Sequence, residues 1–429
     1  MNPIQVTRIA ANFSVISEFM PHIPSAALGL FINHGSRNES EENQGICHLI
    51  EHMLFKGTKN KSANEIASAI ESAGAVLDGF TTKETSGIYC RYPADKFDLM
   101  VHLISELVTQ SSFDKVALER EKNIIEAEIK ESEDDPHEQV FNLLFEVLFQ
   151  NHPFAHPITG KIETIRSITK ERLEDYYHNH FLKSKVCISG AGNINHNELV
   201  NKLSIKNHIS NSPNIPPIIA PLSEPERTFL IQQRDDLTQI HAAAASFTYS
   251  FSDPRRYALT IINNILGGTM SSRFFQRLRE QEGLVYTISS FIDLYSDIGL
   301  IGGYYITDIN NYERTEFAGI EVAMKLKQEG VTQEEFTRAI NYNKAMVAIG
   351  AENPMSRMIR NAQNELILGK TLTVEESIAN YDRLSIDDVN EATEEIRPEK
   401  YSVAAIGQSK QIEKSIRKVP SAGKIIVKN

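Results

Sequence analysis

The sequence predicts an α+β protein that contains two copies of one domain. The chain has 429 residues, which is more than one ordinary hydrophobic core accommodates. Runs of alternating apolar residues, typical of strands, are interspersed with stretches of helix-forming residues. Similar short segments recur in the two halves, in the same order and roughly 210 residues apart. Together these observations predict two domains of similar size, each with both strands and helices.

In the first half, several strands and helices can be assigned from local patterns. Residues 26–32 and 86–92 are alternating apolar runs, which predicts two strands. Residues 62–72 and 96–109 have the composition and spacing of helices. This half therefore contains both kinds of element, as an α+β domain requires.

A helix with a metal-binding pattern lies between these strands. His48, Glu51 and His52 have the order H-x-x-E-H. Two histidines four apart on a helix project from the same face, so both can bind one metal ion, with Glu51 beside them as a base. The alternative is a surface helix that carries these residues by chance. Apolar neighbours favour a buried helix instead, in which His and Glu need the partner that a shared metal provides.

Hydrolysis at zinc needs a third protein ligand, which is expected on another helix. Residues 119–129 contain strong helix formers and neither Gly nor Pro. Glu121 and Glu128 are seven apart and share one face, whereas Glu126 faces elsewhere. A helical glutamate is often simply solvated, so this pattern alone leaves the choice open. Cys47 adjoins His48, but neighbouring helical residues diverge by about 100 degrees, so we expect Cys47 to pack away from the metal.

The second copy is expected to lack a metal site. Aligning Thr58 with Thr269 superimposes the two copies. The positions of His48, Glu51 and His52 are then taken by Leu259, Ile262 and Asn263, respectively. Four prolines within residues 211–221 favour an extended linker. We therefore predict a metal-binding domain at 1–210, a linker at 211–224 and a metal-less domain at 225–429.

Composition restricts the class of protein. Apolar residues make up 41% of the chain and charged residues 23%, typical of a soluble globular protein, and no apolar run is long enough to span a bilayer. The first residues lack the features of a secretory signal or a transit peptide. The three cysteines form no Cys-x-x-Cys pattern, so we expect a cytoplasmic protein. The net charge of −12 and the absence of a basic patch argue against nucleic-acid binding.

Together the motifs resemble one family of zinc peptidases, which includes pitrilysin, insulin-degrading enzyme and mitochondrial processing peptidase. The resemblance rests on residues 48–58 and on the Glu121 and Glu128 pair. It extends over nearly the whole chain through the segments 134–136, 152–160, 191–194, 266–273 and 279–286. It implies two domains, each a mostly antiparallel sheet with helices packed on one side. It also implies one Zn²⁺ per chain, held by His48, His52 and Glu128, with Glu121 supporting the ligands.

The resemblance also implies residues that bind the substrate. Arg279 and Tyr286, from the second half, are expected to reach the substrate at the zinc and to donate hydrogen bonds there. An edge strand is expected to bind the substrate backbone through Asp78, Gly79, Phe80 and Thr81. Most family members have Asn-Ala where this chain has Asp78-Gly79, and Asp lacks the amide donors of Asn. A turn at these two residues is the alternative.

One more position bears on specificity. In processing peptidases, a helix after the third ligand carries two acidic residues that receive a substrate arginine. Glu138 matches the first acidic residue, and Asn142 replaces the second. Together with the net charge of −12, Glu138 predicts a preference for arginine-containing peptides.

These expectations define one main function and two alternatives. The main function is a zinc-dependent endopeptidase that cleaves unstructured, basic or arginine-containing peptides, with Glu51 as general base. Short members of the family pair two chains, so we expect a homodimer or a heterodimer. One alternative is a non-catalytic or partner-dependent subunit of a heterodimer, and the other is a zinc-dependent hydrolase of another substrate. The complete set of ligands, base and Arg/Tyr pair favours the endopeptidase.

Overall fold

The computed structural model describes residues 4–205, 209, 222, 224–417 and 423–428. Most of the predicted linker, residues 211–221 and 223, lies outside the described residues. The chain forms two compact units. The first unit contains residues 1–131, 156–220 and 349–374, and the second contains residues 132–155, 221–348 and 375–429.

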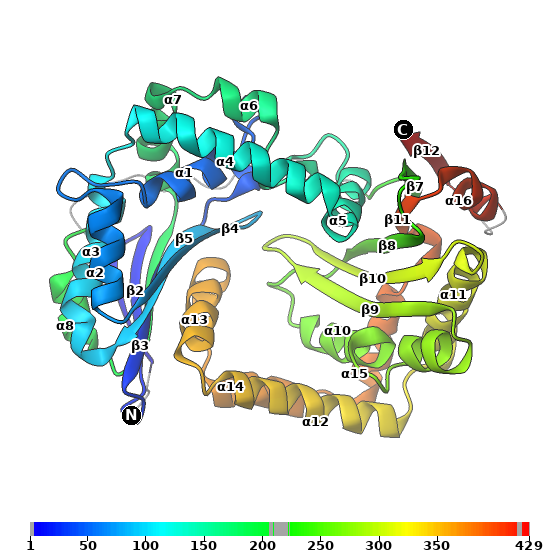
Figure 1. Ribbon diagram of the computed structural model, residues 1–429. Coiled ribbons are helices and arrows are strands. Elements are labelled where there is room, and N and C mark those ends of the chain that lie inside the picture. Colours follow the sequence, from blue (N-terminus) through cyan, green and yellow to red (C-terminus); the bar gives the residue numbers. More distant parts are fainter. Residues whose placement is uncertain (1–3, 206–208, 210–221, 223, 418–422, 429) are drawn as a thin grey trace. The chain divides into compact units, whose positions relative to one another are not determined.

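The first unit is built on a six-stranded sheet with the order β1-β2-β6-β3-β5-β4 (Figure 1). Its strands are β1 (Ile4–Ala10), β2 (Phe13–Phe19), β3 (Ser25–Ile32), β4 (Val76–Thr81), β5 (Ser86–Pro93) and β6 (Val186–Gly192). Only β2 and β6 are parallel, so the sheet is mostly antiparallel. The predicted strands 26–32 and 86–92 correspond to β3 and β5. Among the described strands, β4 pairs with β5 alone and forms one edge of the sheet.

Most helices of the first unit pack on one face of this sheet. They are α1 (Ile46–Leu54), α2 (Ala63–Ser72), α3 (Phe97–Gln110), α4 (Lys115–Asp134), α6 (Ile162–Ser167), α7 (Lys170–Asn179) and α8 (His196–Lys202). Short 3₁₀ turns lie at η1 (Ser36–Asn38), η2 (Glu41–Asn43), η3 (Ala94–Lys96) and η5 (Phe181–Lys183). Leu28 and Leu30 of β3 share one hydrophobic core with Ile50 of α1 and Ile104 of α3. The helices predicted at 62–72, 96–109 and 119–129 correspond to α2, α3 and the middle of α4.

The opposite face of the first sheet is covered by α13 (Pro354–Leu368), a helix from the second half of the sequence (Figure 1). Met358, Ala362 and Leu366 recur at helical spacing on one side of α13. They pack against Ala27 and Phe31 of β3 in a separate hydrophobic cluster. The first sheet is therefore buried on both faces.

The second unit contains a six-stranded sheet in which one edge strand differs from that of the first sheet: it comes from the C-terminal end of the described chain and is parallel to its neighbour, whereas β1 is antiparallel to β2. The order of the second sheet is β12-β7-β11-β8-β10-β9. The strands are β7 (Thr228–Gln233), β8 (Gln239–Thr248), β9 (Val285–Leu294), β10 (Gly299–Asp308), β11 (Ser402–Gly407) and β12 (Lys424–Lys428). β11 is parallel to β7 and antiparallel to β8, as β6 is parallel to β2 and antiparallel to β3.

Helices also cover both faces of the second sheet (Figure 1). One face carries α10 (Arg256–Asn263), α11 (Tyr312–Glu329), α12 (Gln333–Gly350), α14 (Val374–Asp382), α15 (Ile386–Ala392), α16 (Ser409–Ile416) and the π-helical segments η6 (Asn264–Gly268) and η7 (Phe275–Gln281). Short 3₁₀ turns lie at η4 (Pro153–Ala155), η8 (Thr393–Glu395) and η9 (Pro398–Lys400). The other face carries α5 (Pro136–Leu148), a helix from the first half of the sequence. Val140 and Leu144 of α5 pack against Ala243 of β8 and Ala404 of β11.

The fold class is confirmed as α+β, with two homologous sheets that are mostly antiparallel. One detail differs from the expectation that helices pack on one side. α5 and α13 each cover the second face of a sheet that is formed by the other half of the chain, because each carries an apolar side that this face buries. The predicted boundaries at 210 and 225 follow the sequence repeat, whereas the compact units exchange these two helices. None of the described helices is long and apolar enough to cross a membrane.

Candidate metal centre

Helix α1 begins at a strongly anchored N-terminus. Gly45 precedes the helix with a φ of +87°, a left-handed conformation that favours glycine. The buried carboxyl of Glu39 accepts hydrogen bonds from the N–H groups of Gly45, at 2.8 Å, and Cys47, at 2.9 Å. These donors would otherwise be unpaired at the start of a helix. The anchored N-terminus and the buried side of α1 fix the direction in which His48 and His52 project.

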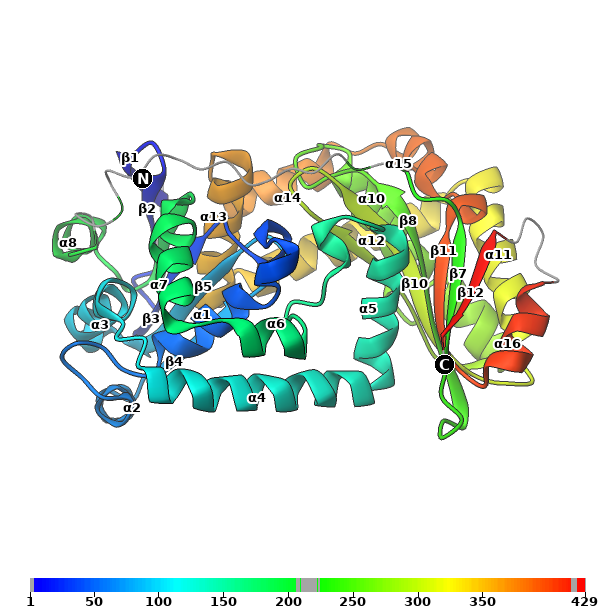
Figure 2. The same ribbon diagram turned by 90° about the horizontal axis from the view of Figure 1, so that it is seen from above.

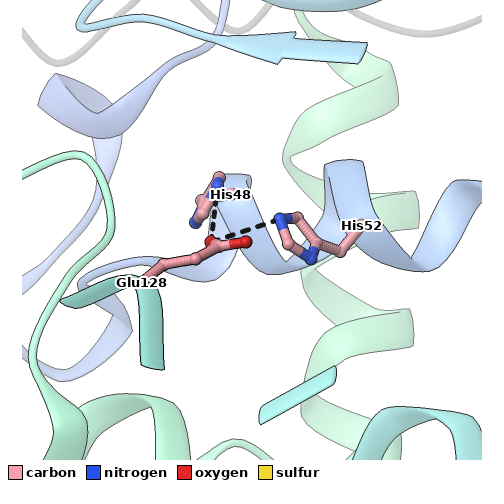
Figure 3. Close-up of side chains that lie close together, drawn as sticks. All are labelled: His48, His52 and Glu128. Carbon is pink, nitrogen blue, oxygen red and sulfur yellow. Dashed lines mark ion pairs between the residues drawn. The ribbon is translucent and has the colours of Figure 1, made fainter. Parts of the chain in front are cut away.

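The structure brings the three predicted ligands together (Figure 3). Oε2 of Glu128, from α4, lies 3.7 Å from Nε2 of His48 and 3.6 Å from Nε2 of His52. Views from the side and from above both show α4 running beside α1 (Figures 1 and 2). Four ligands around a zinc ion at about 2.0–2.1 Å are separated by about 3.3 Å. The three donor atoms are therefore spaced closely enough to bind one zinc ion with a small adjustment.

The protonation of His48 also suits a ligand. Burial, and to a smaller extent the neighbouring His52, lowers the pKa of His48 to about 4. The imidazole is therefore neutral near pH 7 and has a lone pair available for a metal. Nδ1 of His48 is buried and has no hydrogen-bond partner among the described residues. Cys47 is buried in the hydrophobic core, as predicted.

Glu121 lies behind the ligands and contacts His52. Its Oε2 is 3.1 Å from Nδ1 of His52. Because a carboxylate only accepts, this contact places the hydrogen on Nδ1 and leaves the Nε2 lone pair directed at Glu128. Nζ of Lys56 forms an ion pair with Oε1 of Glu121 at 2.9 Å. The sequence analysis assigned no role to Lys56, which lies just after the end of α1 at Leu54, where helical spacing no longer indicates its direction.

Glu51 projects beside the metal ligands, toward β4. Its Oε2 accepts a hydrogen bond from the Thr81 hydroxyl at 2.6 Å. Burial raises the pKa of the Glu51 carboxyl, while the Thr81 hydrogen bond and His52 oppose the rise. A raised pKa makes a carboxylate a stronger base near neutral pH. Position and basicity both suit a group that accepts a proton beside the metal ligands.

The predicted substrate segment is a strand, and the alternative of a turn at Asp78 and Gly79 is wrong. Asp78 is exposed, and its Oδ1 accepts a hydrogen bond from the N–H of Gly79 at 2.9 Å. The Tyr89 hydroxyl donates to Oδ2 of Asp78 at 3.2 Å. Phe80 faces the other side of the sheet, where its ring contacts Phe31. No described strand pairs with the outer edge of β4, and the Asp78 carboxylate lies on this strand.

The remaining predicted residues belong to the second unit. Arg279 lies on η7 and Tyr286 on β9, and the guanidinium carbon is 5.9 Å from the centre of the Tyr286 ring. Tyr286 is 72% exposed, which is unusual for an aromatic residue of a strand. Glu138 is exposed in the first turn of α5, and Asn142 is half-buried one turn later. The approach of these residues to a substrate in the first unit stays a prediction.

The second unit has no counterpart of the metal ligands among its described residues. Leu259 and Ile262 occupy the positions on α10 that match His48 and Glu51, and both are fully buried. Helix α10 is therefore an ordinary core helix. Among the described residues, the one group of three His, Cys, Asp or Glu side chains close enough to hold a metal ion lies in the first unit.

Comparisons with known proteins identify the family. Residues 14–161 match the model for insulinase, peptidase family M16, and residues 167–343 match the model for the peptidase M16 inactive domain. The chain is 32% identical to an uncharacterized zinc protease of Bacillus subtilis, YmxG, over 92% of this chain and 96% of the relative. It is 27% identical to the beta subunit of mitochondrial-processing peptidase of Saccharomyces cerevisiae, over 90% of this chain and 87% of the relative.

Solved structures share the fold. A peptidase M16 inactive domain from Pseudomonas fluorescens has a TM-score of 0.86 at 21% identity and covers 95% of this chain and 98% of its own. A protease from Helicobacter pylori has a TM-score of 0.85 at 17% identity and covers 95% of this chain and 100% of its own. These structures share the fold, and the matches to the family models and to the 32% identical relative show that the chain belongs to peptidase family M16.

Proposed function

We propose that this protein is a zinc-dependent endopeptidase. The observation that carries the proposal is the meeting of His48, His52 and Glu128, whose ligand atoms lie within 4.8 Å of one another, with Glu51 beside them. A neutral His48 and a His52 oriented by Glu121 are what a zinc ligand set requires. The names of the relatives, which include several zinc proteases, support this assignment.

The reaction would use the residues of the first unit as follows. A bound zinc ion would act as a Lewis acid and lower the pKa of a water molecule. Glu51 accepts a proton from the attacking water and later returns it to the amine that leaves. The buried position of Glu51 keeps its carboxylate weakly solvated and therefore basic.

Two groups of residues would hold the peptide. The outer edge of β4 binds an extended substrate as an added strand, through the backbone of Asp78 to Thr81. Arg279 and Tyr286 donate hydrogen bonds to the carbonyl oxygen as negative charge develops on it. Their exposure and mutual contact in the second unit support this role.

Unstructured peptides with arginine are the proposed substrates. The acidic side chain of Glu138 and the net charge of −12 both favour basic peptides. A pair of otherwise identical peptides with Arg or Ala would test this preference, and equal rates of cleavage would remove it. Glu138→Gln should reduce the discrimination between the two peptides.

The active form is proposed to be a homodimer, with a heterodimer as the second candidate. The yeast relative is named as a subunit, which supports assembly with another chain. A non-catalytic or partner-dependent subunit is the rival function, and the name "inactive domain" of one solved relative supports it. The complete ligand set beside Glu51 favours the catalytic role.

The deciding experiment is cleavage of unfolded basic peptides by the purified chain. A chelator should abolish internal cuts, and added zinc should restore them, with products identified by mass spectrometry. Glu51→Gln should retain zinc and lose turnover, because the amide does not accept the proton. Near-normal activity of this variant would contradict the assignment of the base. Bound zinc without cleavage by the wild type would favour the partner-dependent subunit.

A further inference from the structure

Two residues of β4 face the Glu51 side chain. Side chains alternate along a strand, so Gly79 and Thr81 share one face of the sheet and Phe80 points to the other. The Phe80 ring contacts Phe31 and Tyr89 on that other face, with ring centres 5.5 and 6.1 Å apart. Gly79 and Thr81 therefore lie on the side of the sheet that carries α1.

Gly79 leaves the space that Glu51 occupies. A Cβ atom added at Gly79 would lie 2.6 Å from Cγ of Glu51, 3.0 Å from its Oε1 and 3.0 Å from Cε2 of Phe55. Non-bonded carbon atoms pack best at about 3.5–4.0 Å, so this approach is a clash. Cγ is the second atom of the side chain and cannot move aside without a change of rotamer. Gly79 therefore lies in close contact with the Glu51 side chain.

Thr81 holds one oxygen of that carboxylate. Its hydroxyl donates to Oε2 at 2.6 Å, a length typical of a hydrogen bond to a charged oxygen. Threonine is stiff about χ1, and Thr81 is paired with Ser86 of β5, so the donor itself is fixed. Among the described residues, none donates a hydrogen bond to Oε1. This second oxygen is left to accept a proton.

We propose that Thr81 acts as a positioning residue for Glu51, an inference that rests on the proposed peptidase function. Because Thr81 belongs to the edge strand that would bind the substrate backbone, the base and the peptide are aligned by the same strand. The side chain of Thr81 thus acts through Glu51, while its backbone remains available to the peptide.

Three variants test this role. Thr81→Val replaces the hydroxyl by a methyl group of similar size, and Thr81→Ser restores the hydroxyl. Thr82→Val is the matched control, since the Thr82 hydroxyl donates to the carbonyl oxygen of Thr85 in the hairpin and not to Glu51. For each variant, kcat and KM are measured with the same peptide, and the bound zinc per chain is determined separately.

The expected pattern separates positioning from folding. We expect Thr81→Val to lower kcat about 10- to 100-fold, while Thr81→Ser stays within about threefold of the wild type. KM and zinc content should be unchanged in all of them, and Thr82→Val should match the wild type. A Thr81→Val enzyme with normal kcat would refute the role of Thr81. A Thr81→Ser enzyme as slow as Thr81→Val would show that packing, not the hydroxyl, matters.

Crystal structures of the wild type and of the same variants separate this inference from the proposed function. In Thr81→Val the Glu51 carboxylate should leave its place beside β4, whether or not the protein cleaves peptides. If it keeps the wild-type position, the positioning role is wrong. If the wild type binds zinc but cleaves nothing, the proposed function fails and the displacement of Glu51 still decides the inference.

Discussion

A cavity in the second unit supplies a test of how the duplicated core is packed. It has a volume of about 70 Å³ and lies between β8, β10, η7 and α11. Ala244 and Gly303, which pair across β8 and β10, both line it. The matching pair in the first unit is Leu30 and Ile88. Leu30 pairs with Ile188 of β6, four residues before Gly192, and Ala244 pairs with Val403 of β11, four residues before Gly407. Both glycines have a positive φ, so Leu30 and Ala244 occupy equivalent positions. Small residues in the second copy thus leave the space that large residues fill in the first.

Gly303→Ala should fill part of this space and stabilise the protein. The added Cβ would lie 3.4 Å from O of Ser289 and 3.6 Å from Cε2 of Phe274, which are ordinary contacts. One buried methyl group contributes about 0.8 kcal/mol, and the loss of glycine freedom in the unfolded chain contributes about 0.4–1 kcal/mol more. We therefore expect the free energy of unfolding to rise by about 1–2 kcal/mol.

The neighbouring Gly302→Ala is the matched control, with the opposite expected sign. Its Cβ would lie 2.2 Å from O of Ala244, a backbone atom that cannot move aside, so we expect a loss of about 1–3 kcal/mol. Urea unfolding should be followed by circular dichroism, because the chain contains no tryptophan. Destabilisation by Gly303→Ala, or equal effects of the two changes, would refute the cavity and its explanation.

Two further predictions concern the metal centre. Glu121→Ala should weaken zinc binding about 10- to 100-fold, because His52 loses the carboxylate that orients it. Glu126→Ala is the control and should leave the zinc affinity unchanged. Competition with a chelator measures both affinities, and equal values for the two variants would contradict the role of Glu121. Burial raises the pKa of Glu39 from 4.5 to about 7, with the N–H groups of Cys47 and Gly45 opposing the rise. The folded protein then keeps a proton that the unfolded chain has lost, so this carboxyl lowers stability as pH rises from 4.5 to 7, by about 3 kcal/mol in total. Glu39→Gln should remove this pH dependence. Between pH 4.5 and pH 8, the free energy of unfolding of the variant, measured in chelator, should therefore increase by about 3 kcal/mol relative to that of the wild type. A constant difference would show that Glu39 does not titrate in this range.

Local patterns were sufficient for most secondary structure around the candidate site. The spacing of His48, Glu51 and His52 predicted one helix face, and α1 has it, because helical geometry depends only on neighbouring residues. The strand at Asp78 and Gly79 was less certain, since both residues favour turns and only pairing with β5 decides the matter. The exchange of α5 and α13 had no local signal, because an apolar helix face does not specify which sheet will bury it.

By itself, the sequence determined the two-copy α+β organisation, the metal-binding helix and the loss of that helix's ligands in the second copy. Only the tertiary structure decided that Glu128 meets the histidines, that Lys56 pairs with Glu121, and that Gly79 and Thr81 contact Glu51. The same holds for the cavity beside Gly303. The physical reason is one of range: periodicity and turn chemistry follow from adjacent residues, whereas contacts between distant segments follow from how helices and sheets pack.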